Sequence, residues 1–250
     1  MKITDYRTQL RVLADWTPFL CQHSGLPGPR GNLELAHAAA QEDPLRLAPY
    51  LALDPQAAPE NTPECFLAFC GVLGLGARLA RGEQGALTPL RAFAADPRWR
   101  VREAVATGLQ LWGDADLPAL LAEMPRWAEG GFFEQRAAVA ALCEPRLLVQ
   151  PAAVAIVLDV LDTCTAALTR AAGHRDPGCE ALRKALGYGW SVAVAADGLA
   201  GQGRARFERW LASPDRDVRW VLRENLKKNR LERLDPTWVA ALKAALVGEN

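Results

Sequence analysis

One stretch of this 250-residue chain occurs twice, and the echo constrains the fold more than any other feature. The first copy is Asp96–Trp112, DPRWRVREAVATGLQLW, and the second is Ser213–Leu226, SPDRDVRWVLRENL, at an offset of 117 residues. The matched positions are Phe93 with Trp210, Pro97 with Pro214, Val101 with Val218, Arg102 with Arg219, Val105 with Leu222, and Leu109 with Leu226. An internal echo of this kind is typical of a repeat architecture.

Helical periodicity extends over almost the whole chain and predicts an all-α protein. Before the echo, the expected helices are Tyr6–Cys21, Leu33–Gln41 with Asn32 as its cap, Pro44–Leu53, and a long apolar helix from Pro63 to Ala80. From there the chain divides into helix pairs: Ala86–Ala95 with Arg98–Trp112, Asp116–Ala128 with Phe132–Leu142, Pro151–Ala171 with Gly178–Ala196, and Arg204–Ala212 with Asp215–Lys228, closed by Asp235–Val247.

Two glycine- and proline-rich features organise the N-terminal part. Asp54–Pro63 has three prolines in ten residues and is expected to be a loop. It predicts a boundary between a helical cap, residues 1–60, and a repeat array, residues 61–250, within a single continuous domain. Gly71, Gly74 and Gly76 lie inside the long apolar helix, and because no strand precedes them they favour close helix packing over a phosphate loop.

At these residues the chain resembles the HEAT-repeat family. The resemblance rests on the Asp-Pro or Ser-Pro turn followed by Val-Arg and apolar positions, and it covers about Leu87 to Leu234. Arginines recur at comparable points of the second helices, at 102, 136, 183 and 219. The resemblance implies a right-handed α-α superhelix of helix pairs that binds proteins or nucleic acids on a concave surface.

Composition excludes several classes of function. Lys+Arg and Asp+Glu both number 29, so no overall charge draws the protein to nucleic acid or membrane. The longest apolar run, Cys65–Ala77, is too short to span a bilayer, and the N-terminus lacks the apolar core of a signal peptide. We therefore expect a cytoplasmic protein with no membrane partner.

The cysteines and histidines point to no cofactor and no metal. The six cysteines, at 21, 65, 70, 143, 164 and 179, form no Cys-x-x-Cys pair and are expected to be free, mostly buried thiols. Cys164, His174 and Cys179 match no familiar metal-ligand spacing. Neither the histidines nor Ser191 belongs to a recognisable nucleophile motif.

The second copy of the echo carries a row of cations that the first copy lacks. We call Arg216, Arg219, Arg223, Lys227 and Arg230 the basic strip, since they follow one side of a helix. Gly203–Arg233 holds ten Lys/Arg and five Asp/Glu, a local charge of +5. The strip could hold phosphates or an acidic peptide, or its arginines could brace neighbouring repeats. For Arg102 and Arg136, pairing with the adjoining repeat is the favoured interpretation.

Some of the eight tryptophans add a second set of candidates. Trp112, Trp190 and Trp210 fall on apolar faces and are expected in the core. Trp99 and Trp220 fall away from those faces, so Trp220 either packs against an adjacent helix or stacks on a partner.

We therefore predict a non-catalytic binding scaffold, with a protein as the first choice of partner and nucleic acid as the second. The predicted partner-binding residues are Arg102, Arg136, Arg183, Arg219, Trp220, Arg223 and Lys227. The alternative is a DNA-repair protein, because the chain also resembles, more weakly, the HEAT-like glycosylases that excise alkylated bases. That group uses tryptophans with a catalytic aspartate. The nearest candidates are Asp114 and Asp116 beside Trp112, and the pair Asp159 and Asp162, but none matches the motif, so no catalytic residue is assigned.

Overall fold

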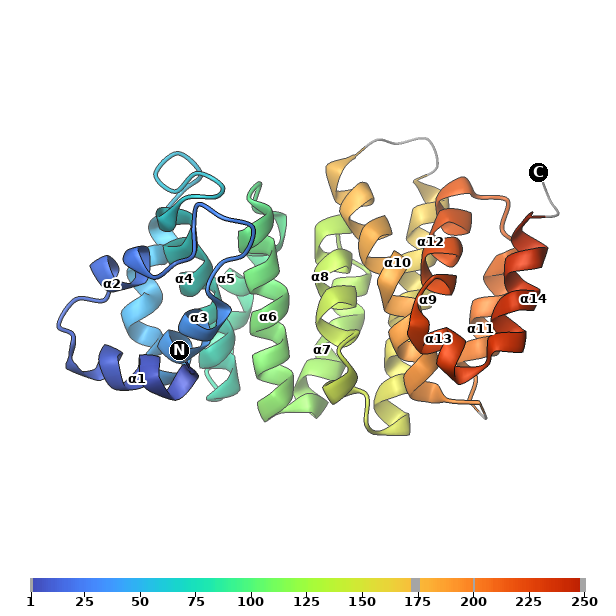
Figure 1. Cartoon of the computed structure of the whole chain (residues 1–250), viewed down its shortest axis with the longest axis horizontal. Coiled ribbons are helices and arrows are strands. Elements are labelled where there is room, and N and C mark those ends of the chain that lie inside the picture. Colours follow the sequence, from blue (N-terminus) through green and yellow to red (C-terminus); the bar gives the residue numbers. More distant parts are fainter. Residues whose placement is uncertain (1, 172–175, 200, 248–250) are drawn as a thin grey trace. The chain divides into compact units, whose positions relative to one another are not determined.

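The computed structural model describes residues 2–171, 176–199 and 201–247, and over these residues it contains helices and no strand (Figure 1). The predicted all-α class is therefore confirmed. The chain divides into two compact units, Met1–Leu117 and Pro118–Asn250. The boundary predicted near residue 60 lies inside the first of these units.

The first unit is built around one apolar helix, α4 (Pro63–Ala80). Its other elements are α1 (Ile3–Val12), α2 (Thr17–Gln22), α3 (Leu33–Glu42), the 3-10 helices η1 (Pro44–Ala52), η2 (Gln84–Ala86) and η3 (Phe93–Ala95), and the helices α5 (Leu87–Ala92) and α6 (Trp99–Ala115). Every residue of α4 from Cys65 to Ala77 is buried, and the helix contacts α2, α3, η1, α5 and α6. It is the core of this unit.

The glycines of α4 allow these close contacts, as predicted. A Cβ atom added at Gly76 would lie 2.2 Å from the Cα of Gly108 in α6. The nearest atoms to added Cβ atoms at Gly71 and Gly74 would belong to η1, at 3.1 to 3.2 Å. Small residues therefore set the separation between α4 and its neighbours.

The predicted helix Tyr6–Cys21 is wrong, because the structure has two helices there. The chain leaves α1 at Leu13, which is extended, and re-enters a helix at Thr17. Pro18 lies in the first turn of α2, where its missing N–H costs nothing, so it favours a new helix start over continuation. Trp16, between the helices, is buried and donates a hydrogen bond to the carbonyl of Leu10 at 2.8 Å. The predicted helix at Pro44–Leu53 is present as a 3-10 helix.

The second unit is arranged around α10 (Pro177–Asp197). Its other elements are α7 (Leu117–Ala128), α8 (Phe132–Leu142), η4 (Pro145–Leu147), α9 (Pro151–Arg170), α11 (Gly203–Arg209), η5 (Trp210–Ala212), α12 (Arg216–Leu226), α13 (Asn229–Leu234) and α14 (Pro236–Val247). Helix α10 contacts α8, α9, α11, α12 and α13. The short helix α13 was not expected from the sequence.

The sequence echo is also an echo in local structure. The 3-10 turns η3 and η5 start at Phe93 and Trp210, and the helices that follow start at Trp99 and Arg216. Both pairs of starting points differ by 117 residues. The matched apolar positions are buried in both copies: Val101 and Val218, Val105 and Leu222, Leu109 and Leu226. The repeated unit is thus a short helix, a 3-10 turn and a longer helix.

Two helices, α4 and α9, are long and apolar enough to cross a membrane by length and composition alone. Within the structure, 78% of the apolar window of α4 and 56% of that of α9 are buried. Core helices of soluble proteins meet the same criterion, so this is weak evidence for a membrane span.

Candidate functional site

The seven predicted partner-binding residues are divided between the two units. Arg102 lies on α6 in the first unit, and the other six lie in the second. Arg102 donates hydrogen bonds from Nη1 to the carbonyls of Asp96 at 2.6 Å and Pro97 at 2.9 Å. It therefore braces the turn that precedes its own helix. Arg136 lies half-buried on α8.

Arg183 and Trp220 form one cluster between α10 and α12. The guanidinium of Arg183 lies 4.3 Å from the centroid of the Trp220 ring, and its Nη1 donates to Asp217 Oδ1 at 2.8 Å. A Cβ atom at Gly187 would lie 2.9 Å from the Trp220 ring, so the indole rests against the backbone of α10. Of the two alternatives for Trp220, the structure shows packing between helices.

Asn225 is the residue of this region that sequence reasoning missed. It is fully buried, and its Oδ1 accepts a hydrogen bond from the backbone N–H of Ser191 at 2.7 Å. Its Nδ2 donates to the carbonyls of Leu186 and Val221, both at 2.8 Å. A polar residue among the apolar positions of α12 was the only sequence signal. The bonds to Ser191 and Leu186 join α12 to α10 and so fix the direction of the basic strip.

The middle of the basic strip is attached to the end of α14. Arg219 and Arg223 each donate from Nη2 to the carbonyl of Leu246 at 3.2 Å. Cations are favoured at this end of a helix, where carbonyls lack intrahelical donors. Further along, Lys227 pairs with Glu224, and the Arg230 guanidinium lies 4.8 Å from the ring centroid of Tyr188.

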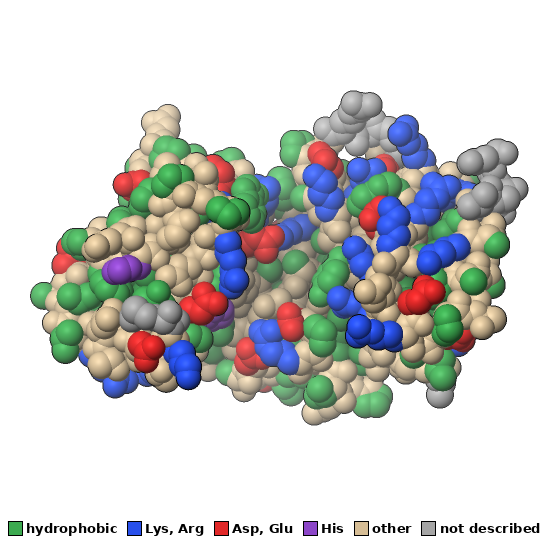
Figure 2. Space-filling view, in the orientation of Figure 1, with side chains coloured by type: hydrophobic (Ala, Val, Ile, Leu, Met, Phe, Trp, Pro, Cys, Tyr) green, Lys and Arg blue, Asp and Glu red, His purple; other side chains and the backbone are tan. Residues whose placement is uncertain are grey.

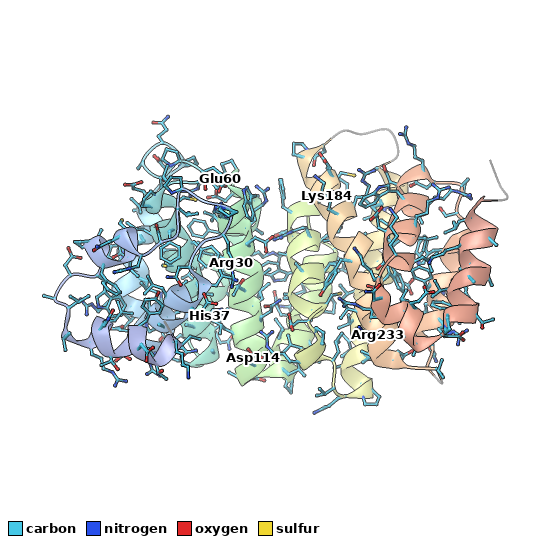
Figure 3. The ribbon with its side chains drawn as sticks, viewed as in Figure 1. Arg30, His37, Glu60, Asp114, Lys184 and Arg233 are labelled. Atoms are coloured by element: carbon cyan, nitrogen blue, oxygen red, sulfur yellow. The ribbon has the colours of Figure 1, made fainter. Side chains whose placement is uncertain are left out.

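Positive charge gathers on this part of the second unit. Figure 2 shows Lys and Arg side chains over α10, α12 and α13, and Figure 3 labels Lys184 on α10 and Arg233 on α13. Arg216, Arg223 and Arg233 are exposed, and none of the three forms an ion pair within the described part of the chain. The Leu246 carbonyl that Arg223 contacts carries no net charge, so this cation is not neutralised.

The two acidic residues of α9, Asp159 and Asp162, form ion pairs with arginines of α11. Asp162 accepts hydrogen bonds from Arg206 at 3.1 Å, from Arg209 at 2.8 Å and from the Trp210 indole at 2.8 Å. Asp159 also pairs with Arg206, and the bond to this carboxylate raises the pKa of the Arg206 guanidinium. These bonds tie α9 to α11 and leave Asp162 engaged on both oxygens. Trp112 is buried, so the Asp114–Asp116 end of α6 offers no accessible tryptophan at that position.

The cysteines form no reactive centre in the described residues. Five are buried and Cys21 is half-buried, as expected for free thiols. Burial raises the pKa of Cys65 to about 11 and that of Cys164 to about 12. No group of three or more His, Cys, Asp or Glu among the described residues is arranged to hold a metal ion. His174 lies outside those residues.

The first unit holds a second candidate, a mostly apolar pocket of about 210 Å³. It lies between the connector Leu26–Leu33, α4 and the first half of α6. Phe66, Phe69 and Trp99 line it, and Trp99 is 47% exposed. The sequence signal was the position of Trp99 away from the apolar face of its helix. The two labelled residues Arg30 and Glu60 mark this side of the unit in Figure 3.

Comparison of the chain with protein-family models, curated proteins and solved structures finds no match. The resemblance to HEAT repeats therefore rests on the echo and on its repeated local structure. The case for a function rests on the basic strip and the pocket.

Proposed function

We propose that this protein is a non-catalytic binding scaffold whose basic strip holds an acidic segment of a protein partner. The observation that carries the proposal is the pair of exposed arginines on α12, Arg216 and Arg223, which lack carboxylate partners among the described residues. Arginine forks suit carboxylates, which they bind with two parallel hydrogen bonds. The local charge of +5 over Gly203–Arg233 supports attraction of an acidic segment over some distance.

The scaffold in this proposal is a HEAT-like array that continues as a right-handed superhelix. Its support is the recurrence of helix, 3-10 turn and helix at an interval of 117 residues, with the same positions buried. A solenoid of this kind distributes its stability between neighbouring repeats and needs no catalytic centre. A cytoplasmic location stays a prediction.

A protein partner fits the strip better than duplex nucleic acid does. Helix α12 has 11 residues, so it is about 16 Å long at about 1.5 Å per residue, and Asp217 and Glu224 lie among its cations. A peptide can space its carboxylates so that they avoid Asp217 and Glu224. The evenly spaced phosphates of a duplex would lie against these two acids and be repelled by them. Trp220 is engaged with α10 and Arg183, so it is not free to stack on a base.

The test is binding of a fluorescent, glutamate-rich 12-residue peptide to the whole chain, followed by anisotropy. Arg216→Glu should weaken binding roughly three- to tenfold, since it reverses one exposed charge of the strip. The double variant Arg216→Glu, Arg223→Glu should weaken it further. Lys2→Glu is the matched control, because it also places Glu at the start of a helix and should leave the affinity unchanged.

Two outcomes would count against a protein partner. Equal binding of the peptide by the parent chain and the double variant, with helix content intact, would show that the basic strip does not bind it. Tight binding of duplex DNA that falls steeply with salt and is lost in the same variants would favour the nucleic-acid alternative. No DNA binding at low salt would exclude the repair interpretation.

A further inference from the structure

The two exposed arginines of α12 stand at a defined interval. Arg216 and Arg223 form no ion pair in the part of the chain that the structure describes. They are seven residues apart, which places them about 10.5 Å apart along the helix axis, at about 1.5 Å per residue. Seven residues also return to the same side of a helix to within about 20°. The basic strip therefore presents two unneutralised positive charges in line, about two helical turns apart.

The side chains between these two arginines are already engaged. Arg219 is half-buried and donates to the Leu246 carbonyl at 3.2 Å. Trp220 rests against the backbone of α10 and lies 4.3 Å from the Arg183 guanidinium. Arg223 also donates to the Leu246 carbonyl, and this bond keeps its guanidinium near the end of α14. A partner therefore meets two separate anchoring points on α12.

An acidic residue follows each of the two arginines in the sequence. Asp217 follows Arg216, and it is paired with a cation of α10. Glu224 follows Arg223 in the same way and pairs with a lysine of α12's end. These acids are also seven residues apart, so they form a second row, about 100° round the helix from the arginines. Like charges in contact disfavour binding, so a partner's carboxylates are favoured only in line with the arginines.

Among regular peptide conformations, a helix matches the interval between the arginines. Two residues seven apart in a helix lie on one side, about 10.5 Å apart along its axis. In an extended chain the side chains of one face repeat every second residue, so their separations are about 6.6 Å and about 13 Å. An extended segment with one carboxylate at Arg216 thus misses Arg223 by roughly 3 Å.

We infer that the acidic segment bound by the basic strip is a helix with two carboxylates seven residues apart on one face. The inference rests on the proposed function and specifies its partner. The partner helix lies alongside α12, and its two carboxylates accept hydrogen bonds from the guanidinium groups of Arg216 and Arg223, one carboxylate to each. The partner residues between the two acids face Arg219 and Trp220, whose polar groups are engaged, so these partner residues need no charge.

The test compares two short alanine-based peptides of the same composition, each with two glutamates and each held helical by a hydrocarbon staple. The glutamates are seven residues apart in one peptide and five in the other, and a spacing of five puts them on different sides of the helix. Each peptide is titrated at low salt into the isotope-labelled whole chain, and the arginine Nε–H signals are followed by NMR.

The peptide with the spacing of seven should bind about three- to fivefold more tightly, as expected for one additional exposed ion pair. It should also shift the Nε–H signals of Arg216 and Arg223 with a single affinity. An unstapled peptide with the same spacing and a proline in its middle cannot form the helix, and it should bind as weakly as the peptide with the spacing of five.

Two variants test the role of the paired anchoring points. Arg223→Gln leaves one point, so it should abolish the preference between the two spacings. Lys184→Gln is the matched control, because it also removes one exposed positive charge from the second unit, on α10 (Figure 3). This control should lower the affinity for both peptides equally and keep the preference.

The outcomes separate this inference from the proposed function. Binding of the glutamate-rich peptide with equal affinity for the two spacings would overturn the helical partner and leave the proposed function intact. A preference that survives Arg223→Gln, or equally tight binding of the proline peptide, would do the same. Failure of every acidic peptide to bind would overturn both. A preference for the spacing of seven that is lost in Arg223→Gln and kept in Lys184→Gln supports the inference.

Discussion

At the scale of single residues, Arg98 links the loop at residues 54–63 to the start of α6. Its side chain is 4% exposed, and its Nη2 lies 2.7 Å from Asp96 Oδ2. Its Nη1 donates to the backbone carbonyls of Leu53, Asp54 and Ala58. The sequence did not predict this contact, because its acceptors are backbone carbonyls 40 to 45 residues away, and every residue type has such a carbonyl.

Arg98→Ala should lower the free energy of unfolding by about 3–5 kcal/mol, since it leaves the Asp96 carboxylate buried without its counter-charge. Urea unfolding followed by circular dichroism measures this change. Arg30→Ala is the control, because Arg30 is exposed and its pair with Glu34 is worth at most about 0.5 kcal/mol. A loss below about 1 kcal/mol for Arg98→Ala would show that the buried pair is not as the structure describes it.

The cysteines make a second prediction at this scale. Burial raises the thiol pKa of Cys65 to about 11 and of Cys164 to about 12, and Cys70 and Cys143 are shifted upward as well. Because only the thiolate reacts, these groups should stay unreactive in the folded protein at pH 8. A chromogenic disulfide reagent should modify Cys21 first and the others only on unfolding. Rapid modification of several thiols in the native protein would contradict the burial.

At the scale of elements, the contact between α4 and α6 depends on two glycines. In Gly76→Ala the new methyl would lie 2.2 Å from the Cα of Gly108, and that backbone cannot move aside without separating the helices. We expect a loss of about 1–3 kcal/mol or more, the usual result of overpacking.

Thermal unfolding of Gly76→Ala beside Gly85→Ala measures this effect. Gly85 is the matched control, since nothing lies within 4 Å of a Cβ added there and its φ is not positive. Equal melting temperatures for the two variants would mean that α4 and α6 are not in close contact.

The sequence predicted most elements, because their signals are local. Asn32 caps α3 by accepting from the backbone N–H of Leu35, and Pro63 opens α4, both as expected. The errors lie where a tertiary contact competes with periodicity. The helix expected over Tyr6–Cys21 is interrupted where Trp16 turns inward to bond with Leu10, and apolar spacing alone does not reveal such a break.

At the scale of the whole molecule, the candidate sites depend on contacts between distant segments. The arginines of the strip were visible as a helical pattern, but their acceptor, the Leu246 carbonyl, lies 27 residues from Arg219 and 23 from Arg223. The pocket joins a connector, α4 and α6, and no sequence motif unites these three. The sequence therefore indicated the charge of the proposed binding surface, but not the contacts that hold it in place.

Matched residues of the two copies of the echo also belong to different kinds of surface. In the first copy, Trp99 and Arg100 line a pocket. In the second copy, the residue matched to Trp99 is Arg216, the first of the basic strip, and the residue matched to Arg100 is Asp217, which accepts a hydrogen bond from Arg183. One repeated local structure thus supports two different surfaces. This fits the proposed scaffold, in which stacking of repeats would fix the buried positions and leave the exposed ones to vary.

The central claim, that the basic strip receives an acidic segment, is tested most directly by mapping the contact on the whole chain. Isotope-labelled protein is titrated with the glutamate-rich peptide, and amide and arginine Nε–H signals are followed by NMR. We expect the largest shifts in α12 and α13, at the Nε–H groups of Arg216 and Arg223, and we expect these shifts to be lost in the double variant. Shifts confined to other helices, or unchanged in that variant, would contradict it.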